Sequence, residues 1–123
     1  MLFDSSVLIA HLRGDGRARD LLRHRVQAGR AYASVISRAE LEGGMRSAER
    51  PDVARLFEAL VLLPVTDAIA SQAGSHLRQH RSSHRGIDLA DYLIGATAKE
   101  HNLELSTLNV RHFPAFPDLR PPW

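Results

Sequence analysis

The stretch MLFDSSVLIA, residues 1–10, places a single carboxylate, Asp4, between two apolar segments. The residues before Asp4 predict a short strand, and Val7 to Ala10 predict an apolar helical stretch. No local packing problem is solved by a carboxylate at this position, and burying an unpaired charge is energetically expensive. We therefore interpret Asp4 as a functional residue that faces a cation.

Other acids and one amide occupy comparable places, where predicted strands end or predicted helices begin. The full set is Asp4, Glu40, Asp88, Asp91 and Asn109. Carboxylates that converge on one point repel each other unless a hard metal ion neutralises them. The set therefore predicts a metal-dependent enzyme.

Strand-like and helix-like segments alternate along the chain. Strands are expected at residues 1–4, 31–35, 62–65 and 103–106, and helices at residues 5–12, 16–28, 37–47, 67–79 and 88–101, with one more helix beginning near Pro51. This alternation predicts an α/β fold, with a small parallel sheet that carries helices on both faces. In such sheets the site lies at the carboxyl ends of the strands, where Asp4, Glu40, Asp91 and Asn109 would meet.

Each of these polar residues except Asp4 also has a structural interpretation. Ser37 and Glu40 have the spacing of a helix capping box. Asp88 would cap the helix that carries Asp91 in its first turn. Asn109 has the character of a turn residue. Taken singly these structural roles are the commoner ones, so the functional hypothesis rests on the joint pattern and on Asp4.

Composition narrows the class of protein further. A length of 123 residues with 44% hydrophobic residues fits one domain with one ordinary core. No apolar run approaches the ~18 residues of a membrane span, and the start shows no signal-peptide pattern. The absence of cysteine excludes disulfides, thiolate zinc sites and a cysteine nucleophile. These features fit a cytoplasmic protein.

The net charge is only +2, but 15 of the 16 basic residues are arginine, since Lys99 is the sole lysine. Basic residues gather between Arg13 and Arg30 and, without any acid, between His76 and Arg85. Such segments either contact a polyanion or form a solvated helix face. There is no phosphate-binding glycine loop and no nucleophile elbow. Metal-free acid–base chemistry by His80 and His84 stays open.

Four segments of the chain resemble the motifs of PIN-domain ribonucleases, most closely the VapC toxins of prokaryotic toxin–antitoxin pairs. The segments are Leu2 to Ile9, Ala33 to Leu41, Asp91 to Ala98 and Ser106 to Phe113. They span nearly the whole chain in the family's order, which makes the resemblance specific.

The resemblance implies a PIN-like α/β/α sandwich, a single PIN domain over residues 1–123, a Mg²⁺ or Mn²⁺ site and RNA cleavage. By motif matching, Asp4, Glu40 and Asp91 look like the family's acidic residues. The fourth motif departs from the family, because Asn109 or His112 stands where an aspartate is usual. That departure leaves open whether one or two metal ions bind, and whether Asp88 replaces the missing acid.

The resulting hypothesis is metal-assisted hydrolysis of RNA by a toxin of a type II toxin–antitoxin system. Asp4, Asp91 and Glu40 would hold the metal, with Asn109 as a fourth catalytic residue. Substrate contacts are expected from Ser6, Thr107 and Arg85. The resemblance further implies a small VapB-like antitoxin and a homodimer within the complex. Two alternatives remain: a non-catalytic nucleic-acid-binding partner protein, and a receiver-like phosphoacceptor module, which would need a lysine near its acidic pocket.

Overall fold

The computed structural model describes residues 1–123. Its strands are β1 (Leu2–Phe3), β2 (Tyr32–Ser34), β3 (Val61–Leu63) and β4 (Leu105–Ser106). Its α-helices are α1 (Ser5–Leu12), α2 (Gly16–Gln27), α3 (Val35–Gly44), α4 (Arg50–Ala59), α5 (Asp67–His80) and α6 (Leu89–Glu100). Short 3-10 helices occupy Ser47–Glu49 and Val110–His112.

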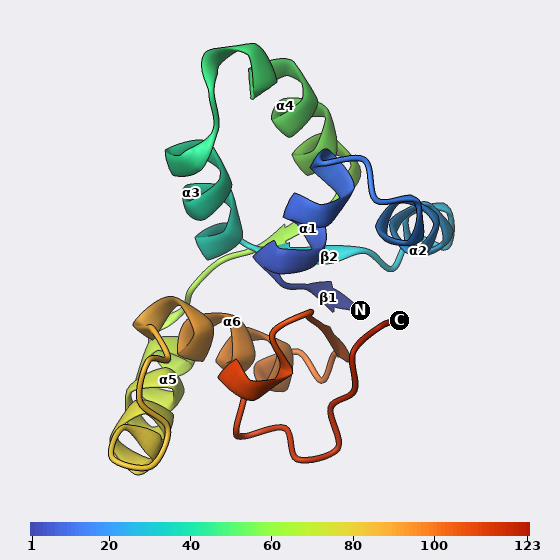
Figure 1. The fold of residues 1–123 in the computed structure, drawn as a ribbon. Coiled ribbons are helices and arrows are strands. Elements are labelled where there is room, and N and C mark those ends of the chain that lie inside the picture. Colours follow the sequence, from blue (N-terminus) through green and yellow to red (C-terminus); the bar gives the residue numbers. More distant parts are fainter.

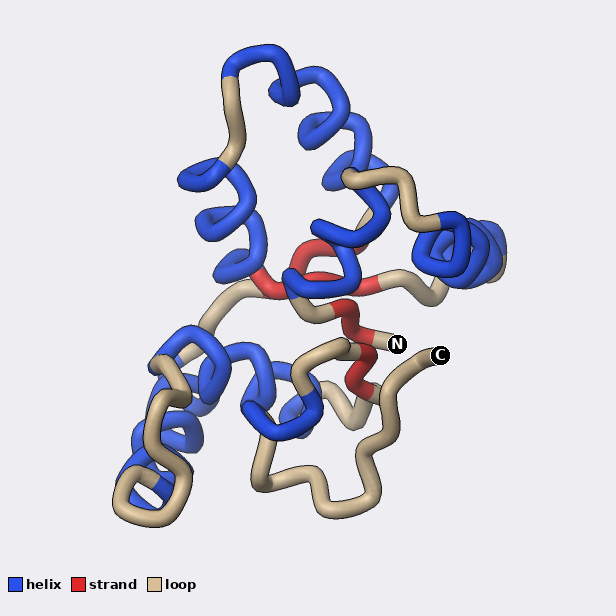
Figure 2. The backbone as a smooth tube through the Cα atoms, in the orientation of Figure 1, coloured by secondary structure: helices blue, strands red, loops and turns tan.

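The four strands form one parallel sheet in the order β3-β2-β1-β4. Figure 1 shows α1 to α4 on one face of this sheet and α5, α6 and the carboxyl-terminal tail on the other. The tube view in Figure 2 shows the thin sheet between the two helical layers. The predicted α/β class, with a central parallel sheet covered on both faces, is therefore confirmed.

Successive residues of β1 supply both layers of the core, because neighbouring side chains of a strand point to opposite faces. Phe3 is fully buried with α1, α2 and α4, whereas Leu2 is fully buried with α6 and Phe113. A third apolar cluster joins α5 to α6 through Ile69, Ala73, Tyr92 and Ala96. A strand of only two residues thus anchors the two main layers of the fold.

The α3 helix begins earlier than predicted. Ser34 caps it, with its Oγ accepting a hydrogen bond of 3.0 Å from the Ile36 N–H, so Ser37 lies inside the helix and is fully buried. The predicted capping box of Ser37 and Glu40 is therefore wrong. Ser34 and Ser37 are both possible N-cap residues, and Ser34 takes this role because β2 ends there.

The apolar run at residues 62–65 would suit a buried strand, but the strand that forms there, β3, is only partly buried. β3 lies at the edge of the sheet, and the side chain of Val61 is 48% exposed. An apolar, β-branched run does not distinguish an edge strand from a central one. The other strands and helices form within a few residues of their predicted bounds.

At the opposite edge, β4 is followed by the proline-rich tail. A hollow of about 500 Å³ lies between this edge and the tail, lined by Leu105, Phe116 and Leu119 among others. The tail contains no α-helix, as its prolines predict. The longest helix, α5, has 14 residues, and no helix has both the length and the apolar character needed to cross a bilayer.

We expect Ile94→Ala to lower the free energy of unfolding by about 2–5 kcal/mol, because it opens a cavity in a fully packed layer. Ile94 is fully buried in α6, between the sheet and the tail. The matched control is Leu89→Ala in the same helix, where the side chain is 54% exposed and the expected change is within about 0.5 kcal/mol. Urea unfolding followed by circular dichroism measures both. Equal losses for the two variants would contradict the assigned packing of α6.

Candidate active site

The register of the sheet places Asp4 beside Thr107. Leu2 pairs with Leu105 and Phe3 with Ser106, so the next residue of each strand leaves the sheet at the same level. Asp4 is buried, with 3% of its surface exposed. Its Oδ2 accepts hydrogen bonds from Thr107 Oγ1 at 2.8 Å and from Ser6 Oγ at 2.7 Å.

Asp4 also has a local structural role, contrary to the expectation from the sequence. It is the N-cap of α1, and its Oδ2 accepts a longer hydrogen bond of 3.4 Å from the Ser6 N–H. Capping alone does not require burial of the carboxylate, because exposed caps satisfy helix ends equally well. The two short hydroxyl contacts compensate for the loss of water around the charge.

The two hydroxyls that hold Asp4 are themselves fixed by the backbone. The Leu108 N–H donates to Ser6 Oγ at 3.0 Å, and the Asn109 N–H donates to Thr107 Oγ1 at 2.9 Å. Since every hydrogen bond to the Asp4 side chain falls on Oδ2, Oδ1 remains available to a ligand. Ser6 and Thr107, predicted as substrate contacts, thus lie against Asp4 and set its orientation.

Glu40 projects from the second turn of α3, where it is exposed at the side of the site. The Ser5 hydroxyl donates to Glu40 Oε1 at 2.7 Å and lies 2.9 Å from Ser37 Oγ. These serines therefore join the start of α1 to α3. Neither Ser5 nor Ser37 was predicted as a site residue, and the Ser-Ser pair directly after Asp4 is the only sequence signal for the first of them.

Asp91 lies in the first turn of α6, as predicted, with Asp88 as the N-cap residue. Its burial and the neighbouring charge of Asp4 raise the pKa of Asp91 to about 6, to which Glu40 adds a smaller effect in the same direction. His112 acts in the opposite direction, and its Nδ1 lies 3.1 Å from Asp91 Oδ2. The raised pKa therefore reflects first the burial of Asp91 and then its proximity to Asp4, with a smaller contribution from Glu40.

The fourth motif contributes His112 rather than an acid to this cluster. Asn109 is exposed, and the structure gives it a backbone hydrogen bond to Thr107 but no side-chain bond to the carboxylates. Asp88 is exposed and makes no side-chain capping bond. The sequence identified position 112 only as a departure from the family, and the structure gives it a contact with Asp91.

The other predicted candidates form no hydrogen bond or ion pair with Asp4, Glu40 or Asp91. Arg85 is exposed in the turn between α5 and α6. His80 and His84 stack edge to face with ring centroids 5.2 Å apart at the end of α5. The Lys99 ammonium lies 4.6 Å from the centroid of Phe116, so the acidic pocket lacks the lysine that a receiver-like module needs.

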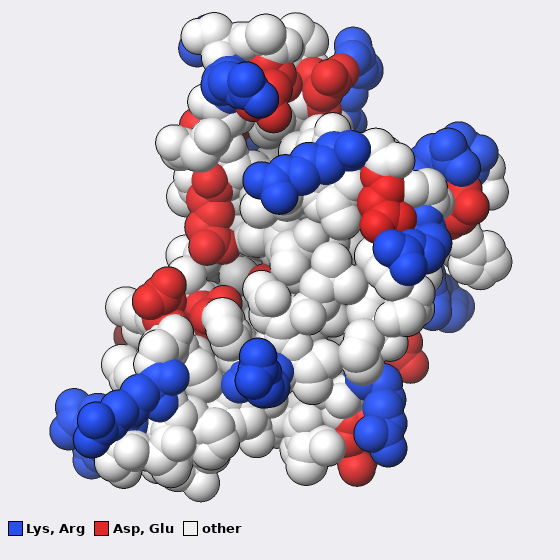
Figure 3. All heavy atoms as spheres, in the orientation of Figure 1, with Lys and Arg blue, Asp and Glu red and all other residues white.

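Figure 3 shows acidic side chains on both sides of the indentation between α3 and the α5–α6 pair. No three histidine, aspartate or glutamate side chains stand in an arrangement that already forms a metal site. Serine, threonine and histidine partners hold one oxygen of each carboxylate instead. The donor set consists of carboxylate oxygens, which suit a hard divalent cation. Fold and site together define an α/β protein with a converging acidic centre at the carboxyl edge of its sheet.

Comparison with known proteins identifies the family. A family model described as the PIN domain matches residues 1–118. The chain belongs to the PIN-domain family. It is 52% identical over 123 residues to ribonuclease VapC10 of Mycobacterium tuberculosis, with 100% of this chain and 92% of that protein covered. It is 46% identical over 123 residues to ribonuclease VapC19 of the same organism, with 99% and 98% covered. These identities place it with the VapC type of the family.

Solved structures agree on the fold. A toxin–antitoxin complex from Klebsiella pneumoniae superposes with a TM-score of 0.78 at 24% identity, covering 99% of this chain and 97% of that one. FitAcB from Neisseria gonorrhoeae gives a TM-score of 0.68 at 27% identity, covering 91% and 89%. The PIN-like α/β/α fold that the resemblance implied is thus confirmed.

The raised pKa of Asp91 has a consequence for stability. An ordinary aspartate releases its proton near 3.8, whereas the folded protein holds this proton to about pH 6. Between these values the folded state binds more protons than the unfolded state, so stability falls as the pH rises through this window. Above about pH 6 this loss of stability is complete and does not increase further.

We therefore expect Asp91→Asn to stabilise the metal-free protein at pH 7 by roughly 1–3 kcal/mol and to leave it nearly unchanged at pH 4. Asparagine mimics the neutral carboxyl that the site favours. Thermal unfolding with a chelator, at both pH values, measures the difference. Asp88→Asn is the matched control, since this exposed cap tolerates asparagine. An Asp91→Asn protein no more stable than the wild type at pH 7 would refute the raised pKa of Asp91 and the burial and neighbouring charge assigned to it.

Proposed function

We propose that the chain is a divalent-metal-dependent endoribonuclease and the toxin of a type II toxin–antitoxin system. The observation that carries this proposal is the buried, hydroxyl-held Asp4 near Asp91, whose pKa is raised by its own burial and then by the charge of Asp4. The two M. tuberculosis relatives are named ribonucleases and are similar along their whole length, which supports the reaction class.

The residues fit a divalent metal ion, and Mg²⁺ is the cofactor we propose, with Mn²⁺ as a substitute. Asp4 and Asp91 would hold it through the oxygens that their hydrogen bonds leave available, and Glu40 would complete the site. A bound ion of this kind lowers the pKa of water and neutralises charge that develops on the phosphoryl oxygens. It would also relieve the repulsion that raises the pKa of Asp91.

The remaining side chains position the reactants. Glu40, with Oε1 held by Ser5, keeps Oε2 for a hydrogen bond from the attacking water. Ser6 and Thr107 fix Asp4, so their removal would loosen the site without removing a charge. Asn109 is exposed beside Thr107 and would bind water or the RNA, and Arg85 would contact the RNA backbone.

We expect the purified protein to cleave single-stranded RNA with Mg²⁺, to stop in EDTA and to recover when metal is added back. Attack by water leaves a 5′-phosphate and a 3′-hydroxyl, and end-group analysis of the products identifies these groups. Asp4→Asn and Asp91→Asn should each lower the rate by at least about 10²-fold, whereas Asp88→Asn should retain it. Cleavage in EDTA that leaves a 2′,3′-cyclic phosphate would point instead to His80 and His84.

The proposed partners are a small VapB-like antitoxin and a second copy of the chain, both in the cytoplasm. The similar structure from Klebsiella pneumoniae is a toxin–antitoxin complex, and two further structures with the same fold, from Rickettsia felis (TM-score 0.78, 18% identity) and Salmonella typhimurium (TM-score 0.78, 20% identity), are VapBC complexes bound to DNA. A partner's arginine would suit the acidic centre, because a guanidinium pairs with carboxylates through two hydrogen bonds.

We expect the chain, expressed from its native operon with a tag, to co-purify with a small protein in a complex that contains two toxin chains. Light scattering coupled to gel filtration gives the mass of the complex, and growth assays measure whether the chain is toxic to cells. Expression alone should arrest growth, and Asp4→Asn should abolish the arrest. A wild-type chain that is harmless alone and recruits no small protein contradicts the toxin assignment.

A further inference from the structure

Two hollows lie against α1, next to the acidic centre. One, of about 440 Å³, is enclosed by α1, α3 and the segment that leads into α4. The other, of about 460 Å³, lies between α1, the turn before α2 and Leu108. Ile9 and Arg13 line both hollows, so the two lie next to each other along α1, and together they are here called the α1 groove.

The α1 groove meets the acidic centre on two sides. Glu40 lines the first hollow. Ser6 lines the second, and its hydroxyl donates to Asp4 Oδ2 at 2.7 Å. Leu108, whose N–H is bound to Ser6 Oγ, stands at the same end with 37% of its surface exposed. A strand lying in the groove would therefore pass the carboxylates.

The charged side chains that line the two hollows of the α1 groove are Arg13, Arg46, Asp15, Glu40 and Glu49, and Arg13 is the one arginine among them that forms no ion pair. Arg46, which lines the first hollow, pairs with Glu49 at 3.4 Å, and Arg17, which follows the groove, pairs with Asp15 at 3.1 Å. Arg13 is exposed and has no carboxylate within ion-pair distance. An unpaired guanidinium at the C-cap of α1 is free to bind a phosphate through two hydrogen bonds.

The walls of the groove are aliphatic. Ile9, Ala10 and Leu108 line the second hollow, and Leu12, Leu41, Met45 and Val53 line the first beside Ile9. Single-stranded nucleic acid binds where cations follow the backbone and apolar side chains accept the faces of unstacked bases. The α1 groove offers one arginine without an ion pair, Arg13, and an aliphatic wall, both next to Ser6 and Glu40 of the acidic centre.

We propose that single-stranded RNA lies in the α1 groove, with Arg13 on a backbone phosphate and Leu108 against a base next to the cleaved bond. This inference rests on the proposed ribonuclease function and adds the path of the substrate strand. Arg13 contributes affinity for any sequence, because phosphates carry no base identity. Leu108 contributes through apolar contact and adds no charge.

The test uses Asp91→Asn as a binding background that does not cleave, in the presence of Mg²⁺. Fluorescence anisotropy of a labelled 12-nucleotide RNA of mixed sequence is measured at several salt concentrations. The salt slope is the steepness with which the logarithm of the binding constant falls with the logarithm of the salt concentration. Adding Arg13→Ala should weaken binding about three- to tenfold and reduce this slope by about 0.7, the value of one phosphate contact on a single strand. Arg13→Lys should restore the slope. Leu108→Ala should weaken binding with the slope unchanged.

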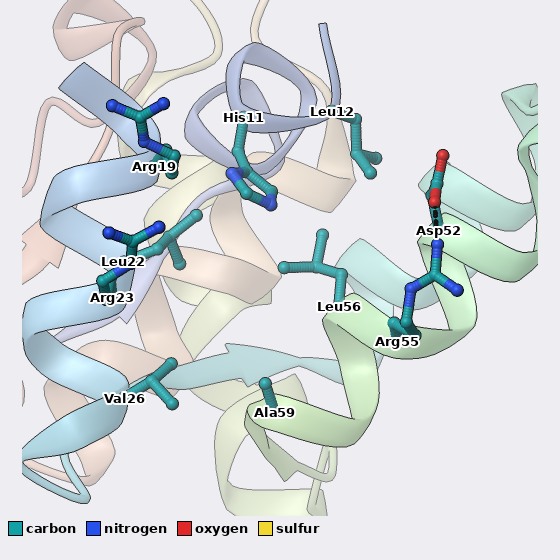
Figure 4. A pocket seen from close by; sticks show the side chains of 10 residues that line it. All are labelled: His11, Leu12, Arg19, Leu22, Arg23, Val26, Asp52, Arg55, Leu56 and Ala59. Carbon is teal, nitrogen blue, oxygen red and sulfur yellow. Dashed lines mark hydrogen bonds and ion pairs between the residues drawn. The ribbon is translucent and has the colours of Figure 1, made fainter. Parts of the chain in front are cut away.

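Arg23→Ala is the matched control. Arg23 is also exposed and unpaired, but it lies in the separate pocket between α1, α2 and α4, where Arg19, His11 and Leu56 surround it (Figure 4). When Arg23→Ala is added to the Asp91→Asn background, the affinity for RNA and the salt slope should equal those of the background protein. In otherwise wild-type protein, Arg13→Ala should raise KM and leave kcat unchanged, because a remote phosphate contact binds substrate and transition state equally.

Two outcomes overturn the proposal, and they are distinguishable. If the background protein binds RNA but Arg13→Ala behaves as Arg23→Ala does, the groove is not the path, and the ribonuclease function stands. A groove that serves the protein partner instead would give this result together with weaker co-purification of the partner. If the background protein binds no RNA and the wild type cleaves none, the proposed function fails and the path fails with it.

Discussion

The hydrogen bonds from Ser6 and Thr107 to one oxygen of Asp4 are the constraint on which the site depends. They satisfy a carboxylate that the sheet would otherwise bury without a partner, at a substantial cost in free energy. They also join the first turn of α1 to the end of β4, which are about a hundred residues apart in the chain. Because Leu108 and Asn109 donate to the same two hydroxyls, the first part of the fourth motif, Thr107 to Asn109, is built around Asp4.

The acidic centre is consequently a balance between attraction and repulsion. Hydroxyl donors stabilise the charge on Asp4, but that charge disfavours ionisation of Asp91. His112 offsets part of this effect, because its ring lies 3.1 Å from Asp91 Oδ2 and its charge lowers the pKa of Asp91.

The alternation of strands and helices, and the residues at the ends of the strands, were predictable because they follow from local hydrophobic pattern. Asp4 and Asp91 were correctly located at element ends for that reason. The capping role of Asp4 and the true start of α3 were not, because Ser34 and Ser37 offer similar caps and only the length of β2 decides between them. The contacts of Ser5 with Glu40 and of His112 with Asp91 join residues 35 and 21 positions apart, so they depend on packing rather than on sequence neighbours.

The carboxyl-terminal tail determines how the sheet ends. β4 is an edge strand, and an unprotected edge presents backbone groups that can pair with another chain. Phe116 and Leu119 of the tail pack against the layer that includes Leu105, while the prolines of the tail lack the N–H groups needed to form a fifth strand. The tail therefore shields the edge without extending the sheet. Aggregation through intermolecular strand pairing is disfavoured on this side of the molecule, and association with other chains is left to side-chain surfaces on the helices.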